Sequence, residues 1–263
     1  FLQKNKFKSF KKTLNNLHNP KSNLDIFSND FRRLAYDEIL SNLLALYSAR
    51  KVVKIKKKRK KAFKSELSNI LKKNFKFKLT EGQNKILSEI DKDLKSNSRM
   101  FRLLQGDVGS GKTILALIAA ANVLEDNFQV AFMAPTEILA KQHYELAIDL
   151  FKTTNINIGL ITSKIVGTEK NKIINNLRNG NIKLLFGTHS LFQKKINFLN
   201  LGFVVIDEQH KFGVNQRIKL AKKGGDNCDV LTMSATPIPR TMMLSFFGDM
   251  DISVLDEKPK YRK

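Results

Sequence analysis

Cysteine is almost absent from this sequence of 263 residues, in which Cys228 is the single example. One cysteine excludes an internal disulfide and a metal site built from several cysteines, and it is typical of a reducing compartment. The four histidines are far apart, and none has a metal-ligand spacing to another histidine or to the cysteine. No apolar run approaches the roughly 18 residues that cross a membrane, and the N-terminus does not resemble a signal peptide. We therefore expect a cytoplasmic protein without membrane association.

Acidic residues are also scarce, with 24 Asp and Glu against 47 Lys and Arg, which gives a net charge of +23. A strongly basic domain commonly binds polyanions such as nucleic acid. However, the chain is rich in Lys, Asn, Ile and Phe and uses far more Lys than Arg, as an A/T-rich genome would encode. Charge alone therefore leaves both explanations open. The length allows one large domain with an appendage, and both ends are expected to be cuts in a longer protein.

The first part of the chain predicts helices. One is expected over Phe7–Leu17, and a second starts at Asp30, with Asp30 or Ser28 as its cap. Apolar residues then recur at steps of three and four through Leu46, the pattern of an amphipathic helix. In the following run, Lys51–Lys61, eight of eleven residues are basic. This run could follow a phosphate backbone, or it could be a solvated helix end or a flexible charged stretch, and both interpretations stay open.

A glycine-rich turn lies between the apolar runs 100–104 and 114–124. Its glycines allow a tight turn that brings backbone N–H groups against phosphate oxygens, and the helix that follows adds its positive end. In such a loop Lys112 reaches the β- and γ-phosphates, and the Thr113 hydroxyl ligates Mg²⁺. A plain turn explains the glycines but not the Lys-Thr pair. We therefore predict a nucleotide site at Gly106, Asp107, Val108, Gly109, Ser110, Gly111, Lys112 and Thr113.

A helix is expected upstream of this loop, through about Leu94. Thr80 and Gln83 have the spacing of a capping box. A glutamine amide also offers the donor and the acceptor that reading an adenine edge requires, and Phe77 could cover the base. Capping and adenine reading both remain possible for Gln83.

Short apolar segments alternate with helical ones after the loop. Strands are expected at 128–134, 156–161, 182–186, 203–206, 230–233 and 252–255, with helices at 137–151, capped by Thr136, and at 167–179. Near-continuous apolar strands between helices indicate a parallel sheet covered on both faces. In such sheets ligands bind beyond the carboxyl ends of the strands, and the polar clusters of this sequence lie there.

Two acids follow the apolar strand 203–206. Asp207 has the position of the carboxylate that holds Mg²⁺ in phosphate-loop enzymes, and Glu208 is placed to orient or deprotonate a water. Such a pair is common as surface charge, but together with the phosphate loop it indicates ATP hydrolysis. Ser234, Thr236 and His210 could pass the nucleotide state to another surface.

Five segments resemble, in order and spacing, the first motor domain of superfamily 2 DNA helicases, and most closely the RecG type, which acts on branched DNA in bacteria. They are GDVGSGKT (106–113), APTEILAKQH (134–143), GTHSLFQ (187–193), DEQHKFGVNQR (207–217) and SATPIPRT (234–241). The resemblance covers residues 75–262. It implies an α/β fold: a RecA-like P-loop NTPase domain with a mainly parallel sheet flanked by helices, preceded by a helical linker region.

The resemblance also implies roles for single residues. Gln83 with Phe77 matches the adenine-reading motif, and Lys112, Asp207, Glu208 and His210 match the catalytic positions. The expected positions for DNA contact or coupling are loop residues and helix starts, whose N–H and hydroxyl groups suit phosphate contact without base reading; each alone could be a cap or a turn. They are Pro135, Thr136, Glu137, Gly187, Thr188, His189, Gln209, Ser234, Ala235, Thr236 and Arg240.

The expected organisation is a helical, basic linker region at 1–74 and the first motor domain at 75–263. In this family a second motor domain follows and supplies an arginine for the transferred phosphoryl group, an effect worth orders of magnitude in rate. We therefore expect this chain to bind ATP and Mg²⁺ but to hydrolyse ATP weakly. The implied partners are branched DNA and, as a candidate, a single-strand DNA-binding protein, with a monomer in the bacterial nucleoid.

Other functions compete with this interpretation. A transcription-repair coupling translocase has nearly the same motifs, but it usually has glutamate where this chain has Gln209. A nucleotide-binding DNA-binding module without turnover is a further alternative, although such a module has no need of Glu208. The sequence also departs from the RecG pattern at Lys211, where arginine is usual, and near its end, where the expected Pro-Gly-Arg junction is only partly kept.

Overall fold

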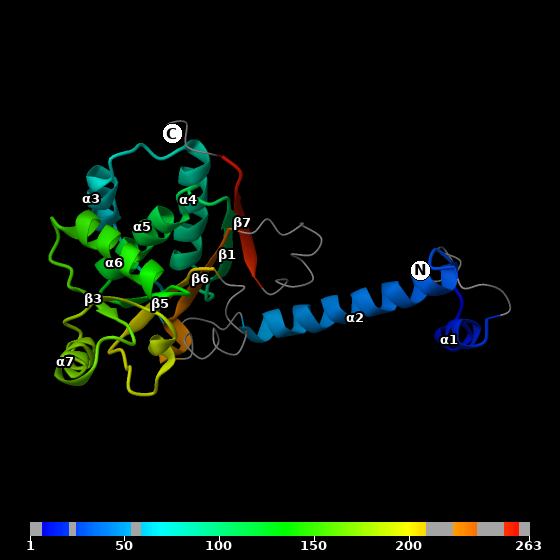
Figure 1. Ribbon diagram of the computed structural model, residues 1–263. Coiled ribbons are helices and arrows are strands. Elements are labelled where there is room, and N and C mark those ends of the chain that lie inside the picture. The colour runs from blue at the N-terminus through cyan, green and yellow to red at the C-terminus, as the bar shows by residue number, and fades with distance from the viewer. Residues whose placement is uncertain (1–6, 21–24, 54–58, 209–222, 236–249, 258–263) are drawn as a thin grey trace. The chain divides into compact units, whose positions relative to one another are not determined.

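The computed structural model describes residues 7–20, 25–53, 59–208, 223–235 and 250–257. The described residues form two compact units, one up to Val52 and the other from residue 59 onward. Figure 1 shows the helices and strands of both. Within the described residues, no helix is long and apolar enough to cross a membrane.

The described part of the first unit consists of two helices, α1 (Phe10–His18) and α2 (Asn29–Val53), and confirms the predicted ones. Ser28 accepts a hydrogen bond from the Phe31 N–H at 3.3 Å and so caps α2. Asp30, in the first turn of α2, accepts from Lys8 Nζ and from Asn16 Nδ2, both at 3.0 Å. These contacts connect the start of α2 to α1 and to the residues just before it.

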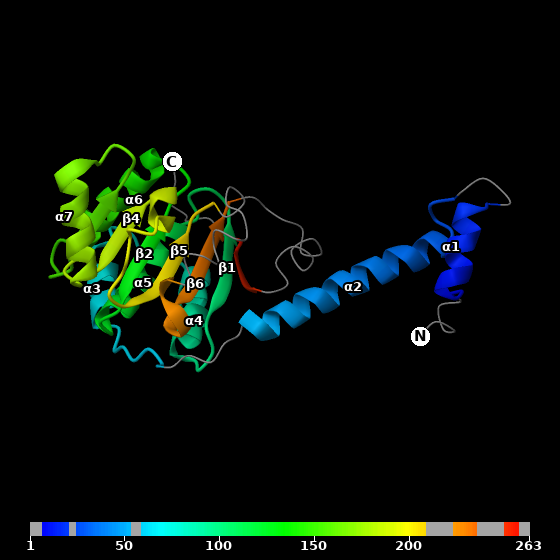
Figure 2. The same ribbon diagram turned by 90° about the horizontal axis from the view of Figure 1, so that it is seen from below.

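The second unit is built on a seven-stranded sheet in which each strand is parallel to its neighbours, in the order β3-β4-β2-β5-β6-β1-β7. Figure 2 shows the central strands side by side. The sheet confirms the predicted fold class, with the expected strand bounds displaced by up to two residues. The strands are β1 (Phe101–Gly106), β2 (Gln129–Met133), β3 (Ile158–Ile161), β4 (Leu184–Gly187), β5 (Leu201–Ile206), β6 (Asp229–Ser234) and β7 (Asp251–Leu255).

Helices cover both faces of this sheet (Figure 1). One core contains buried residues of α4 (Glu81–Lys95), α5 (Lys112–Glu125) and α6 (Glu137–Phe151), and the other contains buried residues of α7 (Gly167–Arg178). Helix α5 is apolar nearly all round because it lies at the centre of its layer. Helix α3 (Glu66–Asn74) is not among the predicted helices, and it packs on α5 and α6 with Leu71 fully buried.

Residues 59–67 run along the amino ends of the central strands, and we call them the amino-edge strap. Lys61 Nζ lies 2.5 Å from Asp229 Oδ2 at the start of β6, and both side chains are fully buried. Arg59 pairs with Asp126, whose other carboxylate oxygen accepts the Ala62 N–H. For Lys61 both interpretations of the run Lys51–Lys61 are wrong, because its side chain is fully buried in an ion pair. The Arg59 side chain is 57% exposed, so both stay predictions for it, and residues 54–58 of the run lie outside the described residues.

Candidate functional site

The predicted phosphate loop lies at the carboxyl edge of the sheet, between β1 and α5. Gly109 and Gly111 have φ values of +76° and +95°, a backbone conformation that favours glycine. A Cβ on Gly111 would lie 2.5 Å from Gln83 Nε2, and one on Gly106 would lie 2.9 Å from Ser110 Oγ. The glycines of this turn are therefore required by its geometry.

Lys112 begins α5 and folds back over its own loop. Its Nζ donates to the Gly106 carbonyl at 2.6 Å and to the Asp107 carbonyl at 2.8 Å, and 8% of the residue is exposed. Burial lowers the pKa of Lys112, and the negative charges of Asp207 and Glu208 oppose that shift. The loop lysine and the two acids after β5 therefore share one electrostatic site.

Gln83 braces the loop from α4. Its Oε1 accepts the Thr80 N–H at 2.9 Å, and the Thr80 hydroxyl accepts the Gln83 N–H at 3.2 Å, which completes the predicted capping box. The Gln83 amide also donates to the Ser110 carbonyl at 2.8 Å. Phe77 is 59% exposed and contacts the Phe75 ring edge-on. The amide thus connects the helix cap to the phosphate loop, and adenine reading by Gln83 and Phe77 stays a prediction.

Asp207 and Glu208 follow β5 directly. Asp207 is 8% exposed, its N–H donates to the Met133 carbonyl at 2.8 Å, and its Oδ1 accepts the Glu208 N–H at 3.0 Å. Glu208 has a φ of +51°, a left-handed conformation that costs a residue with a Cβ about 1–2 kcal/mol. Such conformations collect at functional sites.

Oxygen ligands suitable for Mg²⁺ are present in this site. Asp207 supplies a carboxylate and Thr113, at the start of α5, a hydroxyl, the hard donors that the ion prefers beside water and phosphate oxygens. Ser110 Oγ is buried in the loop and has no hydrogen-bond partner within the described residues. A buried hydroxyl without a hydrogen-bond partner, in a glycine-rich loop, is consistent with a site that binds phosphate.

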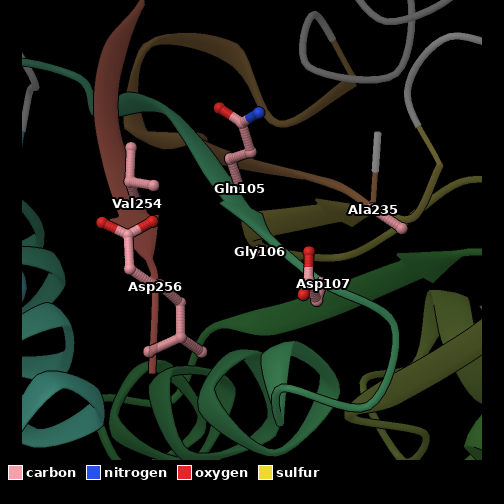
Figure 3. Close-up of a pocket in the computed structure, with 7 residues that line it drawn as sticks. Gln105, Gly106, Asp107, Ala235, Val254 and Asp256 are labelled. Carbon is pink, nitrogen blue, oxygen red and sulfur yellow. The ribbon is translucent and has the colours of Figure 1, made fainter. Parts of the chain in front are cut away.

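A cavity of about 140 Å³ opens beside this loop. Figure 3 shows that its labelled lining residues come from the end of β1 and the start of the loop, from the residue just after β6, and from the end of β7 and the residue after it. Pockets that enclose a drug-sized ligand are roughly 300–1,000 Å³. This cavity therefore holds at most a part of a nucleotide.

The loops predicted to contact DNA follow β2 and β4. Thr136 Oγ1 caps α6 by accepting the Leu139 N–H at 3.3 Å, as predicted, and Glu137 accepts from the Ser163 N–H at 2.6 Å. The Ser163 hydroxyl also donates to Glu137 at 2.5 Å, and these two hydrogen bonds, that of the hydroxyl first, hold the pKa of Glu137 below its usual value. His189 is exposed at the start of a short 3₁₀ helix, His189–Phe192, and the Gly187 carbonyl accepts the Ala134 N–H at 3.0 Å. The two loops therefore lie next to each other at the carboxyl edge.

The remaining predicted positions lie at the end of β6 or outside the described residues. Ser234 is buried opposite Gln105 of β1, and Ala235 lines the cavity. His143 is not among the predicted site residues, and its Nε2 lies 2.8 Å from Asp207 Oδ2. Its position seven residues after the cap Thr136, on a face of α6 turned towards the sheet, is the signal that could have indicated it. The positions outside the described residues are Gln209, His210, Thr236 and Arg240.

Comparison with known families supplies independent information. The model of the DEAD/DEAH box helicase family matches residues 80–244. The ATP-dependent DNA helicase RecG of Aquifex aeolicus (strain VF5) is 42% identical over 268 residues, which cover 100% of this chain and 34% of that protein. The RecG of Thermotoga maritima is 44% identical over 262 residues, covering 100% of this chain and 33% of that protein. The chain thus spans about a third of the length of these curated relatives.

Solved structures agree with this similarity. A structure described as RecG bound to a three-way DNA junction matches with a TM-score of 0.78 and 42% identity, over 89% of this chain and 31% of that one. The helicase MrfA bound to DNA matches with a TM-score of 0.56 at 17% identity, over 78% of this chain. The second likeness shows the fold alone.

Proposed function

Since the chain belongs to the DEAD/DEAH box helicase family, we propose that it is the ATP-binding motor half of an ATP-dependent DNA helicase that acts on branched DNA. Its similarity to RecG over the whole chain supports the choice of DNA, and the solved RecG complex with a three-way junction supports branched DNA. Forks and Holliday junctions in recombination and repair are the proposed substrates.

The observation that carries this proposal is the arrangement of the carboxyl edge. In the sheet, β5, β6 and β1 are neighbours, and the two acids follow β5 while the phosphate loop follows β1. On the other side of β5 lie β2 and then β4, and the loops after these two strands are proposed to contact DNA. A parallel sheet brings all these strand ends to one edge. Nucleotide and DNA would therefore bind to adjacent parts of one rigid framework.

The proposed roles follow from the chemistry of each group. Lys112 would bind the β- and γ-phosphates, and the loop N–H groups between Gly106 and Thr113 would receive phosphate oxygens. Asp207 and Thr113 would hold Mg²⁺, which when bound neutralises phosphate charge. Glu208 would orient the attacking water and accept its proton.

DNA would be held through its backbone. Pro135–Glu137 and Gly187–His189 offer N–H and hydroxyl donors at loop ends and a helix start, which suit phosphate contact without base reading. Ser234 and Ala235 would connect the nucleotide to these loops, together with Gln209, Thr236 and Arg240. We further propose a monomer located in the bacterial cytoplasm at the nucleoid, with a single-strand DNA-binding protein as a partner.

Two proposals concern the organisation of the motor. The sequence suggests a helical, basic linker region at 1–74 and the first motor domain at 75–263, but we propose that the motor domain already begins with the amino-edge strap, since the strap and α3 pack onto the sheet and its helices. A second motor domain would supply the arginine that stabilises the transferred phosphoryl group. This chain alone is then expected to bind ATP, to hydrolyse it poorly and not to separate DNA strands.

The test is ATP turnover with and without forked DNA, measured on this chain and on the protein extended past Lys263. We expect weak turnover in the chain and DNA-stimulated turnover in the extended protein. In the extended protein Lys112→Ala should abolish turnover, and Glu208→Gln should reduce it by about 10²–10⁴-fold. If DNA stimulated turnover in neither protein, the result would support ATP hydrolysis by this site but contradict the proposed helicase function.

A further inference from the structure

His143 connects the acidic end of β5 to helix α6. Its Nε2 lies 2.8 Å from Asp207 Oδ2, and only 11% of each side chain is exposed. An ionised carboxylate can only accept a hydrogen bond, so Nε2 is the donor. Asp207 Oδ1 accepts the Glu208 N–H. Each oxygen of the Asp207 carboxylate therefore has a fixed partner, and one of these partners belongs to α6.

Aromatic packing holds the His143 ring in place. The ring lies against Phe132 of β2, with 5.1 Å between ring centroids, and Phe132 stacks on Phe186 of β4 at the same distance. Close-packed interiors transmit small displacements because they have few voids to absorb them. A movement of His143 would therefore displace Phe132 and Phe186 and, with them, β2 and β4. These strands lead to Pro135–Glu137 and Gly187–His189.

Helix α6 extends this connection to the loops at the carboxyl edge. His143 follows the cap Thr136 by seven residues, about two helical turns and about 10 Å along the axis. In the first turn, Glu137 accepts hydrogen bonds from the Ser163 N–H and hydroxyl, at 2.6 and 2.5 Å, just beyond the end of β3. A single helix thus carries the contact to Asp207 and the contact to the loop after β3.

We propose that His143 is a positioning residue that couples Asp207 to helix α6, so that the nucleotide state changes the loops at the start of α6 and after β3 and β4. This inference rests on the proposed function, because that function assigns the nucleotide to Asp207 and DNA to the loops at the start of α6 and after β4. The coupling is an equilibrium property and is reciprocal: ATP changes the affinity for DNA by the same factor by which DNA changes the affinity for ATP.

The experiment measures the affinity for forked DNA with and without a non-hydrolysable ATP analogue and Mg²⁺, using the protein extended to the length of its relatives. Fluorescence anisotropy gives both dissociation constants and their ratio. We expect the wild-type ratio to differ from one by at least about fivefold, the lower end of typical coupling. His143→Leu should bring the ratio close to one, because leucine cannot donate. His143→Gln, which restores a donor, should recover most of it.

Tyr144→Leu is the matched control. Tyr144 is the next residue of α6 and packs edge-on against Phe186, with ring centroids 6.1 Å apart. Its loss disturbs the same helix without removing the bond to Asp207, so the wild-type ratio should persist. If His143→Leu kept the wild-type ratio of dissociation constants, the role of His143 would be overturned. The same would follow if Tyr144→Leu lost the ratio to the same extent. In both cases the proposed function would stand. A wild-type ratio of one would overturn the role of His143 together with the proposed function.

Discussion

Two buried lysines lie at opposite edges of the same sheet, and their surroundings differ. At the amino edge Lys61 pairs with the carboxylate of Asp229, and its ammonium lies 5.0 Å from the centre of the Phe128 ring. At the carboxyl edge, within the described part of the chain, Lys112 donates to the Gly106 and Asp107 backbone carbonyls of its own loop. A buried charge with a carboxylate partner is satisfied within the fold, whereas backbone carbonyls compensate a charge only in part. The first environment stabilises the domain, and the second suits an anionic ligand.

The largest expected effect is on stability at the amino edge. Lys61→Met leaves the Asp229 carboxylate buried without its partner, which should lower the free energy of unfolding by about 3–5 kcal/mol. Chemical denaturation measures this change. Adding Asp229→Asn removes the charge and keeps an acceptor for the Met100 N–H, so the double variant should regain most of the loss. A double variant as unstable as the single one would contradict the ion-pair account.

At the carboxyl edge the effect should fall on binding instead. Lys112→Ala is expected to weaken ATP binding by about 100-fold, or about 2.7 kcal/mol, because it removes the charge proposed to meet the phosphates. Its free energy of unfolding should change by less than about 1 kcal/mol. Isothermal titration and denaturation on one preparation give both numbers. If Lys112→Ala lowered the free energy of unfolding but left the affinity for ATP unchanged, Lys112 would stabilise the fold as Lys61 does, and the contrast between the two lysines would be wrong.

Helix α6 allows a smaller test at the same edge. Thr136→Ala removes the side-chain cap, which typically costs about 1 kcal/mol of stability, and should weaken DNA binding at the loop after β2. Thr136→Ser keeps the hydroxyl and should restore both quantities. Thr80→Ala removes the corresponding cap of α4 and should cost similar stability without the loss of DNA affinity. If Thr136→Ala bound DNA as tightly as Thr80→Ala, the loop after β2 would not belong to the proposed DNA surface.

The smallest effect concerns Cys228, next to Asp229 at the amino edge. Burial raises the pKa of its thiol to about 12 from an ordinary value of 9.0. Above about pH 9 the unfolded chain loses this proton while the folded chain keeps it, so stability falls as pH rises. Between about pH 9 and pH 10 the wild type should lose under about 1 kcal/mol more than Cys228→Ala. A thiol reagent should react only after unfolding, and rapid reaction with the folded protein would show that the amino edge opens.

The sequence predicts the carboxyl edge better than the amino edge. Gly106–Thr113 and Asp207–Glu208 are local patterns whose residue types follow from chemistry, and apolar periodicity predicts the strands that carry them. Lys61 could not be separated from its basic neighbours, because its burial depends on Asp229, far along the chain. The partner of His143 is also distant, since Asp207 lies 64 residues away, and the place of His143 on the sheet-facing side of α6 was the one local signal for it. Long-range pairing of polar side chains leaves no local periodicity.

Hydrogen exchange with and without Mg²⁺ and a non-hydrolysable ATP analogue tests most directly whether the two edges have these separate functions. We predict slower exchange at Gly106–Thr113, at Gln83 and at Asp207–Glu208, and unchanged exchange along the amino-edge strap, residues 59–67. Protection confined to the strap, or protection at neither edge, would contradict the assignment of the nucleotide to the carboxyl edge.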